Sequence, residues 1–207
     1  GAVLTELNAE VMPVWQVVLK RIIDVVLSLV AIVICIPLYI IAALVVKFTS
    51  EGPIFFLQER IGKGGKPFNI IKYRTMYTDA EKLGPQLSSS HDPRITPSGR
   101  VMRKLRLDEF PQFFNVLKGE MSLVGPRPER QFFIDKISAI EPQFIQLTKV
   151  RPGITSWGQV KYGYAENVDQ MLQRMRYDLL YMKNRTLALD FKIMLHTVLI
   201  VVKAKGK

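Results

Sequence analysis

The sequence predicts a helix-rich, mixed α/β fold: a re-entrant membrane helix-break-helix, then a compact domain with a small β-hairpin and amphipathic helices at the membrane interface. Three observations predict it. An apolar run at 22–46 carries one charge, Asp24, and contains Pro37 near its centre. Two apolar, β-prone stretches then flank a glycine-rich loop. Apolar residues finally recur at helical spacing through the second half of the chain.

Composition indicates an anionic partner at a membrane surface. The 207 residues carry a formal net charge of +11, which favours nucleic acid, a nucleotide or an acidic membrane as partner. A hydrophobic content of 48% favours the membrane among these. The single cysteine, Cys35, excludes an intrachain disulfide and suits a reducing cytosol. Because the chain starts with Gly1, we expect residues 1–19 to be the remnant of a trimmed N-terminal part.

The apolar run is long enough to cross a bilayer but is interrupted. Its 25 residues, at ~1.5 Å each in a helix, exceed the ~30 Å hydrocarbon core. Pro37 kinks or breaks such a helix. By the positive-inside rule, the flanking cations favour the cytoplasm for both ends: Lys20, Arg21 and Lys47. We expect a helix broken near 35–37 that dips into one leaflet. An ordinary spanning helix stays open, because proline is tolerated there.

A β-hairpin is predicted next. Residues 54–57 and 68–71 are apolar and flank the loop 62–66, which reads as a plain turn because no helix follows its glycines. The second strand continues through Lys72 and Arg74. Side chains at i and i+2 share a strand face, so these two cations are predicted to point the same way and to hold a diphosphate. A solvated strand face is the alternative.

Cations then lead into an acidic pair. Residues 77–93 are polar and predict a helix fragment plus a loop. Thr96 and Pro97 begin a helix as N-cap and first residue. The basic residues of this stretch crowd one face and approach Asp108; they are Arg100, Arg103, Lys104 and Arg106. Such a cluster favours an anion-binding site over a solvent-exposed basic surface without a ligand.

Asp108 and Glu109 are the centre of the chain. Asp108 is predicted to be the N-cap of a short helix with Pro111 in its first turn and Gly119 just past its end. An acidic pair at a helix start is most simply a cap. However, a helix N-terminus also attracts phosphate, and the cations upstream favour that second interpretation.

The remaining elements are predicted from turns and periodicity. Arg127 stands between Pro126 and Pro128, so a stiff loop presents its guanidinium. Residues 130–150 predict a helix with an apolar core face, and residues 151–160 a turn and a short extended piece. Helices are predicted at about 168–183 and at 188–202; the last lies in the membrane interface or packs on the domain.

The order of these motifs resembles one family across nearly the whole chain from about residue 18. The residues that carry the resemblance are Lys20-Arg21, Asp24, Pro37, Gly52-Pro53, Gln58-Glu59-Arg60-Ile61-Gly62, Lys72-Tyr73-Arg74-Thr75-Met76, Asp92-Pro93-Arg94-Ile95-Thr96, Leu107-Asp108-Glu109-Phe110-Pro111-Gln112, Asn115-Val116-Leu117-Lys118-Gly119, Met121-Ser122-Leu123-Val124-Gly125-Pro126-Arg127-Pro128 and Val150-Arg151-Pro152-Gly153-Ile154-Thr155. They are similar to the bacterial sugar transferases, the monotopic polyprenol-phosphate phosphoglycosyl transferases. One departure is Ile36 before Pro37, where many relatives have serine.

The resemblance implies an enzyme of the bacterial inner membrane, with a re-entrant helix at 20–49 and a catalytic domain at 50–207 on the cytoplasmic face. It implies transfer of a sugar 1-phosphate from a UDP-sugar, with a hexose as first guess, to undecaprenyl phosphate, with release of UMP. It further implies Asp108 as the nucleophile that becomes a phosphosugar-aspartate, Glu109 as its partner, and Mg²⁺ held by both. Around the diphosphate we expect the cations Lys72, Arg74, Arg103, Arg127 and Arg151.

Two other classes remain open. A membrane-anchored basic module that binds nucleic acid or anionic lipid accounts for the charge and the apolar run, but it leaves Asp108 and Glu109 unexplained. A catalytically inactive scaffold of the same family is the other. If the chain is a transferase, we expect its partners to be the UDP-sugar, undecaprenyl phosphate and membrane lipid, and no nucleic acid. Formation of a homo-oligomer stays open. No residue indicates which sugar is used.

Overall fold

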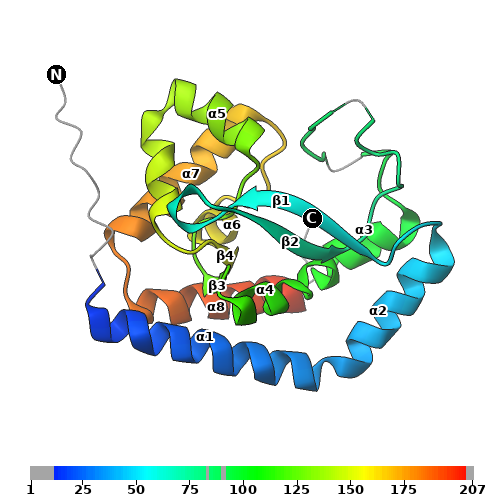
Figure 1. Cartoon of the computed structure of the whole chain (residues 1–207), viewed down its shortest axis with the longest axis horizontal. Coiled ribbons are helices and arrows are strands. Elements are labelled where there is room, and N and C mark those ends of the chain that lie inside the picture. The colour runs from blue at the N-terminus through cyan, green and yellow to red at the C-terminus, as the bar shows by residue number, and fades with distance from the viewer. Residues whose placement is uncertain (1–11, 83, 90–91, 204–207) are drawn as a thin grey trace.

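The computed structural model describes residues 12–82, 84–89 and 92–203, in which eight α-helices and four short strands enclose one main core (Figure 1). The helices are α1 Val14–Ile34, α2 Ile36–Thr49, α3 Pro97–Lys104, α4 Gln112–Lys118, α5 Gln131–Ile140, α6 Trp157–Lys161, α7 Val168–Lys183 and α8 Leu187–Val202. The strands are β1 Phe55–Ile61, β2 Pro67–Tyr73, β3 Ser122–Val124 and β4 Gly153–Thr155. Three 3₁₀ helices join them: η1 Lys63–Gly65, η2 Leu107–Glu109 and η3 Pro142–Lys149. The predicted helix-rich, mixed α/β class is confirmed.

The apolar run forms two helices that meet at an angle of 65°. Cys35 separates them, and Pro37 falls in the first turn of α2, where its missing N–H costs no helix hydrogen bond. The predicted break near 35–37 is confirmed. Within the described residues, no single helix is both long and apolar enough to cross a membrane, whereas the bent pair α1 and α2 together meets that criterion by length and composition. The first of them begins at Val14, ahead of the expected boundary at residue 20, and residues 1–11 lie outside the described part.

One side of α1 carries its few polar groups, and this side faces the domain. Lys20 Nζ donates to the Val124 carbonyl at 3.0 Å and lies 2.5 Å from Asp190 of α8. Asp24 is buried and accepts hydrogen bonds from the Ser122 hydroxyl at 2.7 Å and the Leu123 amide at 3.2 Å. The only charge of the apolar run therefore ties α1 to β3, so the helix lies along the domain.

The hairpin is confirmed. β1 and β2 pair antiparallel, with Leu57 opposite Ile71 and Phe55 opposite Tyr73. Its connection contains η1, in which Gly64 and Gly65 have φ of 71° and 75°, values that glycine adopts without strain.

A second, two-stranded sheet was not predicted. β3 and β4 pair in parallel, Ser122 with Gly153 and Val124 with Thr155. The backbones on this side approach so closely that a Cβ on Gly153 would lie 2.7 Å from the Gly125 carbonyl oxygen. Glycine is required here by contact rather than by φ. This sheet fixes the start of the loop that carries Arg127.

The main core lies between β3, α5, α7 and α8. Its fully buried members include Val116, Met121, Ile137, Met171 and Ile193. The predicted helices at 168–183 and 188–202 are confirmed as α7 and α8, within one residue at each end.

One helix prediction is confirmed only in part, and another is wrong. The helix expected over 130–150 ends at Ile140, because Pro142 cannot continue it, and the chain goes on as η3. The helix fragment expected in 77–93 is absent among its described residues, which form turns instead. Arg94 holds that segment with hydrogen bonds to the Ala80 and Leu87 carbonyls.

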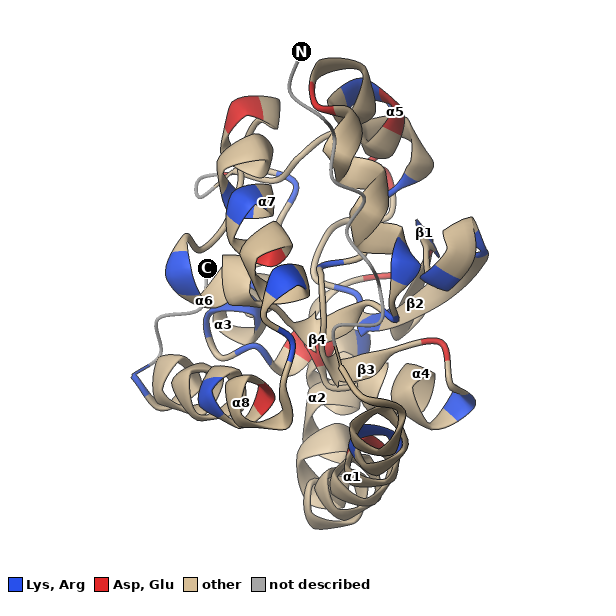
Figure 2. Cartoon of the chain, turned by 90° about the vertical axis from the view of Figure 1, so that its left-hand side faces the viewer, with Lys and Arg blue, Asp and Glu red and all other residues tan. Residues whose placement is uncertain are grey.

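Exposed apolar side chains gather on α1, α2 and α8, which lie on one side of the molecule (Figures 1 and 2). Val14, Ile34, Phe48 and Val202 are more than 70% exposed. Figure 2 shows α1 and α2 mostly without charged residues, whereas Lys and Arg are spread over the domain. A surface of this extent marks a membrane or an interaction face.

Candidate active site

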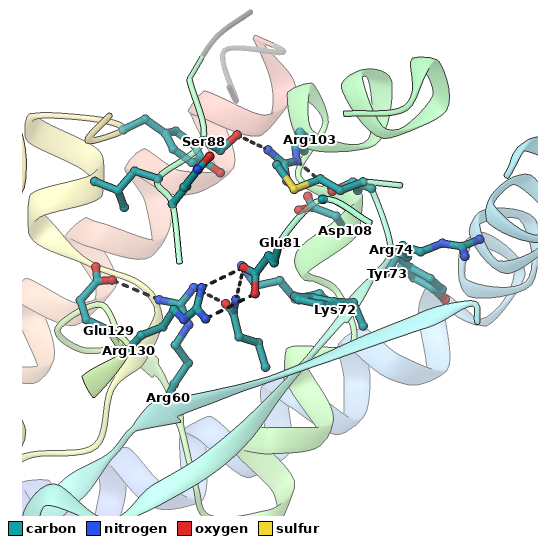
Figure 3. A pocket seen from close by; sticks show the side chains of 18 of the residues that line it. Arg60, Lys72, Tyr73, Arg74, Glu81, Ser88, Arg103, Asp108, Glu129 and Arg130 are labelled. Atoms are coloured by element: carbon teal, nitrogen blue, oxygen red, sulfur yellow. Dashed lines mark hydrogen bonds and ion pairs between the residues drawn. The ribbon is translucent and has the colours of Figure 1, made fainter. Parts of the chain in front are cut away.

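A cavity of about 470 Å³ opens between β1, β2, η2, the loop after β3 and α7. Its size is within the range of small-molecule sites, roughly 300–1,000 Å³. Seven basic side chains line it, namely Arg60, Lys72, Arg74, Arg103, Arg127, Arg130 and Arg174. Asp108 lies among them, with the acidic residues Glu81 and Glu129 farther along the wall (Figure 3). The cavity is therefore shaped for an anionic ligand beside one carboxylate.

Asp108 sits in η2 rather than at a helix N-cap. The expectation of a cap is wrong, because α4 begins at Gln112 with Pro111 as its N-cap residue and no side-chain cap. The chain reaches η2 through Arg106, whose φ of 57° is left-handed. Such a backbone costs a residue other than glycine about 1–2 kcal/mol, and residues of this kind cluster at functional sites. The reversal at Arg106 turns Asp108 towards the cavity. Gly119 does end α4 as predicted, with φ of 88°.

Glu109 is held by three cations. Lys72 Nζ lies 3.4 Å from its Oε1, Arg127 Nη2 lies 3.4 Å from the same oxygen, and Arg106 Nη1 lies 3.3 Å from Oε2. Burial alone would raise the pKa of Glu109, but the charges of Lys72, Arg127 and Arg106 outweigh it and lower that pKa. Glu109 stays ionised and fixes the positions of the cations.

Asp108 has the opposite balance. Its side chain is buried, and burial raises its pKa, to which the charge of Glu109 adds. Lys72, Arg103 and Arg106 act against this rise. Two adjacent carboxylates are thus pushed apart in pKa, a pattern typical of paired acidic residues with separate roles.

Lys72, Arg103 and Arg127, which are predicted to bind the diphosphate, all line the cavity. Burial lowers the pKa of Lys72 to about 8, against the attraction of Glu109. Arg103 is fixed by hydrogen bonds from Nε to the Thr75 hydroxyl at 2.8 Å and from Nη1 to the Ser88 hydroxyl at 2.7 Å. Three cations near one carboxylate fit the recognition of phosphate.

The backbone of Arg127 is held from behind by Asp178 of α7. This buried carboxylate accepts a hydrogen bond from the Gly158 amide at 2.8 Å and another from the Arg127 amide. Burial raises the pKa of Asp178 to about 6.

Arg74 and Arg151 do not join this cluster. Arg74 follows the last residue of β2, so the two-residue alternation no longer governs it, and its guanidinium donates to the Ser50 carbonyl at 2.8 Å and to the Glu51 carbonyl. In Figure 3 its side chain points away from Asp108 towards α2. Arg151 Nε donates to the Gly119 carbonyl at 2.9 Å, at the end of α4. Both arginines donate to backbone carbonyls, although Arg74 also forms part of the cavity lining.

Several residues at the site were not among the predicted ligands. Arg106 and Arg127 lie 5.6 and 5.9 Å from the ring centre of Tyr164, which stacks beneath both guanidinium groups. At the far wall, Glu129 bridges Arg60 at 3.1 Å and Arg174 at 2.5 Å. The run of basic residues before Asp108 could have identified Arg106 as a site residue from the sequence. Tyr164 and Arg174 come from distant segments, and nothing in the sequence ties them to the pair.

The acidic residues near the cavity decide whether Mg²⁺ could bind there. Among the described residues, no three Asp, Glu, His or Cys side chains converge on one point. Mg²⁺ needs fewer, because it binds one or two carboxylates and takes its other oxygens from phosphate and water. Asp108 lines the cavity, whereas both oxygens of Glu109 face cations. The residues therefore fit Mg²⁺ through Asp108 together with a bound diphosphate.

Comparison with known proteins finds the family described as bacterial sugar transferase over residues 15–204. The chain is 43% identical over 188 residues to a UDP-N-acetylgalactosamine-undecaprenyl-phosphate N-acetylgalactosaminephosphotransferase of Aeromonas hydrophila, covering 91% of this chain and 44% of that protein. It is 42% identical over 183 residues to a UDP-glucose:undecaprenyl-phosphate glucose-1-phosphate transferase of Caulobacter vibrioides, covering 86% of this chain and 68% of that protein. An undecaprenyl-phosphate glucose phosphotransferase of Komagataeibacter xylinus is 37% identical over 201 residues, covering 94% of this chain and 38% of that protein. The chain thus spans from about two fifths to about two thirds of these relatives.

Proposed function

The chain belongs to the bacterial sugar transferase family, and on this premise we propose that it transfers a sugar 1-phosphate from a UDP-sugar to undecaprenyl phosphate. The names of the relatives support both substrates. The observation that carries the proposal is the position of Asp108: its carboxylate lines a cavity of about 470 Å³ whose other lining groups include Lys72, Arg103 and Arg127.

The proposed reaction has two displacements. A carboxylate oxygen of Asp108 attacks the phosphorus that bears the sugar, a P–O bond to that carboxylate forms, and the P–O bond to UMP breaks. A phosphate oxygen of undecaprenyl phosphate then attacks the same phosphorus and releases Asp108, leaving the sugar on a lipid diphosphate. Positioning and charge stabilisation are most of the task in such transfers.

The chain's own cations would stabilise the charge. Lys72 and Arg127 are aligned by Glu109 and line the cavity beside Asp108. Because Glu109 anchors these cations, it acts on the substrate through them rather than by attack. Arg103 is fixed on the other side by Thr75 and Ser88. A diphosphate between these groups would present its phosphorus to the carboxylate.

Mg²⁺ would be held by Asp108 and by phosphate oxygens of the substrate, and it would neutralise phosphate charge. In the proposed setting, the bent pair α1 and α2 is a re-entrant anchor in the bacterial inner membrane. The cavity would then open to the cytoplasm, where UDP-sugars are made, at the level of the lipid's phosphate.

The test is chemical. The protein is incubated with UDP-sugar labelled in the sugar, with Mg²⁺ and without acceptor, and we expect label on the protein and UMP in solution. Asp108→Asn is expected to abolish both while the thermal unfolding midpoint is kept. The matched control is Asp79→Asn, since Asp79 is exposed and forms an ion pair with exposed Lys82 at 3.5 Å. Full turnover by Asp108→Asn, or turnover of the wild type without labelled protein, would refute the assignment of Asp108 as the nucleophile.

The sugar requires its own experiment. The relatives named above include glucose and N-acetylgalactosamine transferases of nearly equal similarity, 42% and 43% identical. A panel of UDP-sugars scored by UMP release with undecaprenyl phosphate distinguishes them. We expect a UDP-hexose to be preferred; release with UDP-N-acetylgalactosamine alone would overturn that expectation.

A further inference from the structure

A second concave surface lies on the other side of the hairpin from the candidate active site. It is an apolar groove of about 770 Å³. Its lining residues are Lys47, Gly52, Pro53, Ile54, Phe55, Leu57, Ile71, Pro111 and Phe114, of which Lys47 alone carries a charge. Phe55, Leu57 and Phe114 are between 41% and 59% exposed. An open apolar groove of this size in a charged domain calls for an occupant.

In the middle of the hairpin, successive residues alternate between the cavity and the groove. Phe56, Gln58 and Lys72 face the active-site cavity, whereas their neighbours Leu57 and Ile71 face the groove. Leu57 and Ile71 are cross-strand partners, so they form one continuous apolar patch.

The cavity and the groove meet at one end of the hairpin. Pro53 and Phe55 line both. Residues 108–111 join them at a second place, because Asp108 of η2 lines the cavity and Pro111, three residues later, lines the groove. A molecule with one charged end and one apolar chain could therefore lie in both at once.

The groove is also continuous with the exposed apolar surface. The ring of Phe114 packs edge-on against Tyr39 of α2 at 6.1 Å. Phe48, next to Lys47 in α2, is 83% exposed. An apolar chain leaving the groove would thus reach the side of α2, without crossing the charged surface of the domain.

We propose that this groove binds the isoprene units nearest the phosphate of the polyprenyl phosphate acceptor. The inference rests on the proposed function and adds where the acceptor lies. The phosphate would enter the cavity past Phe55 towards Asp108, Lys47 would supply a positive charge beside the groove, and the rest of the chain would run into lipid along α2.

The test fills the groove without making it polar. Leu57→Trp keeps an apolar side chain at an exposed position, so folding and membrane affinity are retained while the groove is obstructed. We expect the KM for undecaprenyl phosphate to rise at least about fivefold, since chain contacts with apolar surface are lost. The KM for UDP-sugar is expected to stay unchanged. Geranyl phosphate is expected to compete with undecaprenyl phosphate in the wild type and no longer in Leu57→Trp.

The control is Leu195→Trp on α8, where Leu195 is 66% exposed and away from the groove. It is expected to behave as wild type. Equal effects at both positions would mean that the groove meets bulk lipid only and would overturn the proposal. An altered oligomeric size with unchanged acceptor KM would assign the groove to a second copy of the chain and overturn it as well. Absence of transfer by the wild type would instead refute the proposed function.

Discussion

Asp108 and Glu109 are neighbours in sequence with different surroundings. Glu109 has a cation near each of its oxygens, whereas Asp108 faces the cavity and is repelled by Glu109. The pair is therefore better described as a charged anchor, Glu109, and a buried carboxylate that lines the cavity, Asp108, than as two equal ligands. This distinction can be tested by neutralising each residue separately.

Glu109→Gln is expected to lower stability, whereas Asp108→Asn is not. Removing the charge of Glu109 takes the nearest carboxylate away from buried Arg106 and from half-buried Lys72 and Arg127, and breaking buried pairs in this way costs about 3 kcal/mol. Removing the charge of Asp108 relieves repulsion. Thermal unfolding of both variants in detergent gives the comparison. Equal midpoints would show that the three ion pairs do not hold the site.

The pKa of Lys72 predicts the pH above which activity falls. Burial lowers its pKa to about 8, so the ammonium is charged below this pH and neutral above it. Because kcat/KM reports the free enzyme, the value for UDP-sugar is expected to fall about tenfold per pH unit above 8. Lys72→Arg keeps the charge at all these pH values and is expected to remove that fall. An unchanged alkaline limb in Lys72→Arg would assign it to another group.

At the scale of elements, local patterns predicted local structures. The hairpin, the Thr96 cap at 3.0 Å from the Gly99 amide, and the end of α4 at Gly119 each depend on a few adjacent residues. Arg74 shows the limit of this reasoning, because alternation predicts a shared face only while the strand lasts, and β2 ends at Tyr73. The pair β3 and β4 was missed because two strands of three residues, far apart in sequence, give too short a pattern.

That missed sheet supports the site, and Gly153→Ala tests this. The added Cβ would press on the backbone of Gly125, which cannot move aside as a side chain can. We expect a loss of about 1–3 kcal/mol in stability and a raised KM for UDP-sugar, since Arg127 follows Gly125 by two residues.

Gly64→Ala is the control for Gly153→Ala. A Cβ there meets nothing within 4 Å, so only its φ of 71° opposes the change, and the KM for UDP-sugar is expected to stay at the wild-type value. A normal KM in Gly153→Ala would show that the sheet does not position Arg127.

At the scale of the whole molecule, the sequence allows two courses for the apolar run: it either spans the membrane or enters it and returns to the same side. The structure adds a constraint. Between its start and its middle, α1 is tied to the domain by Lys20 and Asp24. At the end of α2, the Thr49 hydroxyl lies 2.7 Å from that of Ser98 in α3, and Arg74 binds the Ser50 carbonyl. Both helices of the bent pair therefore contact the same domain, which favours a return to one side of the bilayer over a span across it.

Cysteine labelling in sealed vesicles tests the resulting topology. Cys35→Ala removes the chain's single cysteine, and Val14→Cys or Glu51→Cys then marks one exposed end of the bent pair. Both ends are expected to react with an impermeant maleimide from the same side, because the domain holds both of them. Ile34→Cys, at the bend and 72% exposed in the structure, is expected to react only after detergent is added, because lipid covers it. Reaction of the two ends from opposite sides would establish a spanning helix and would require the contacts of Asp24 or of Arg74 to break in the membrane.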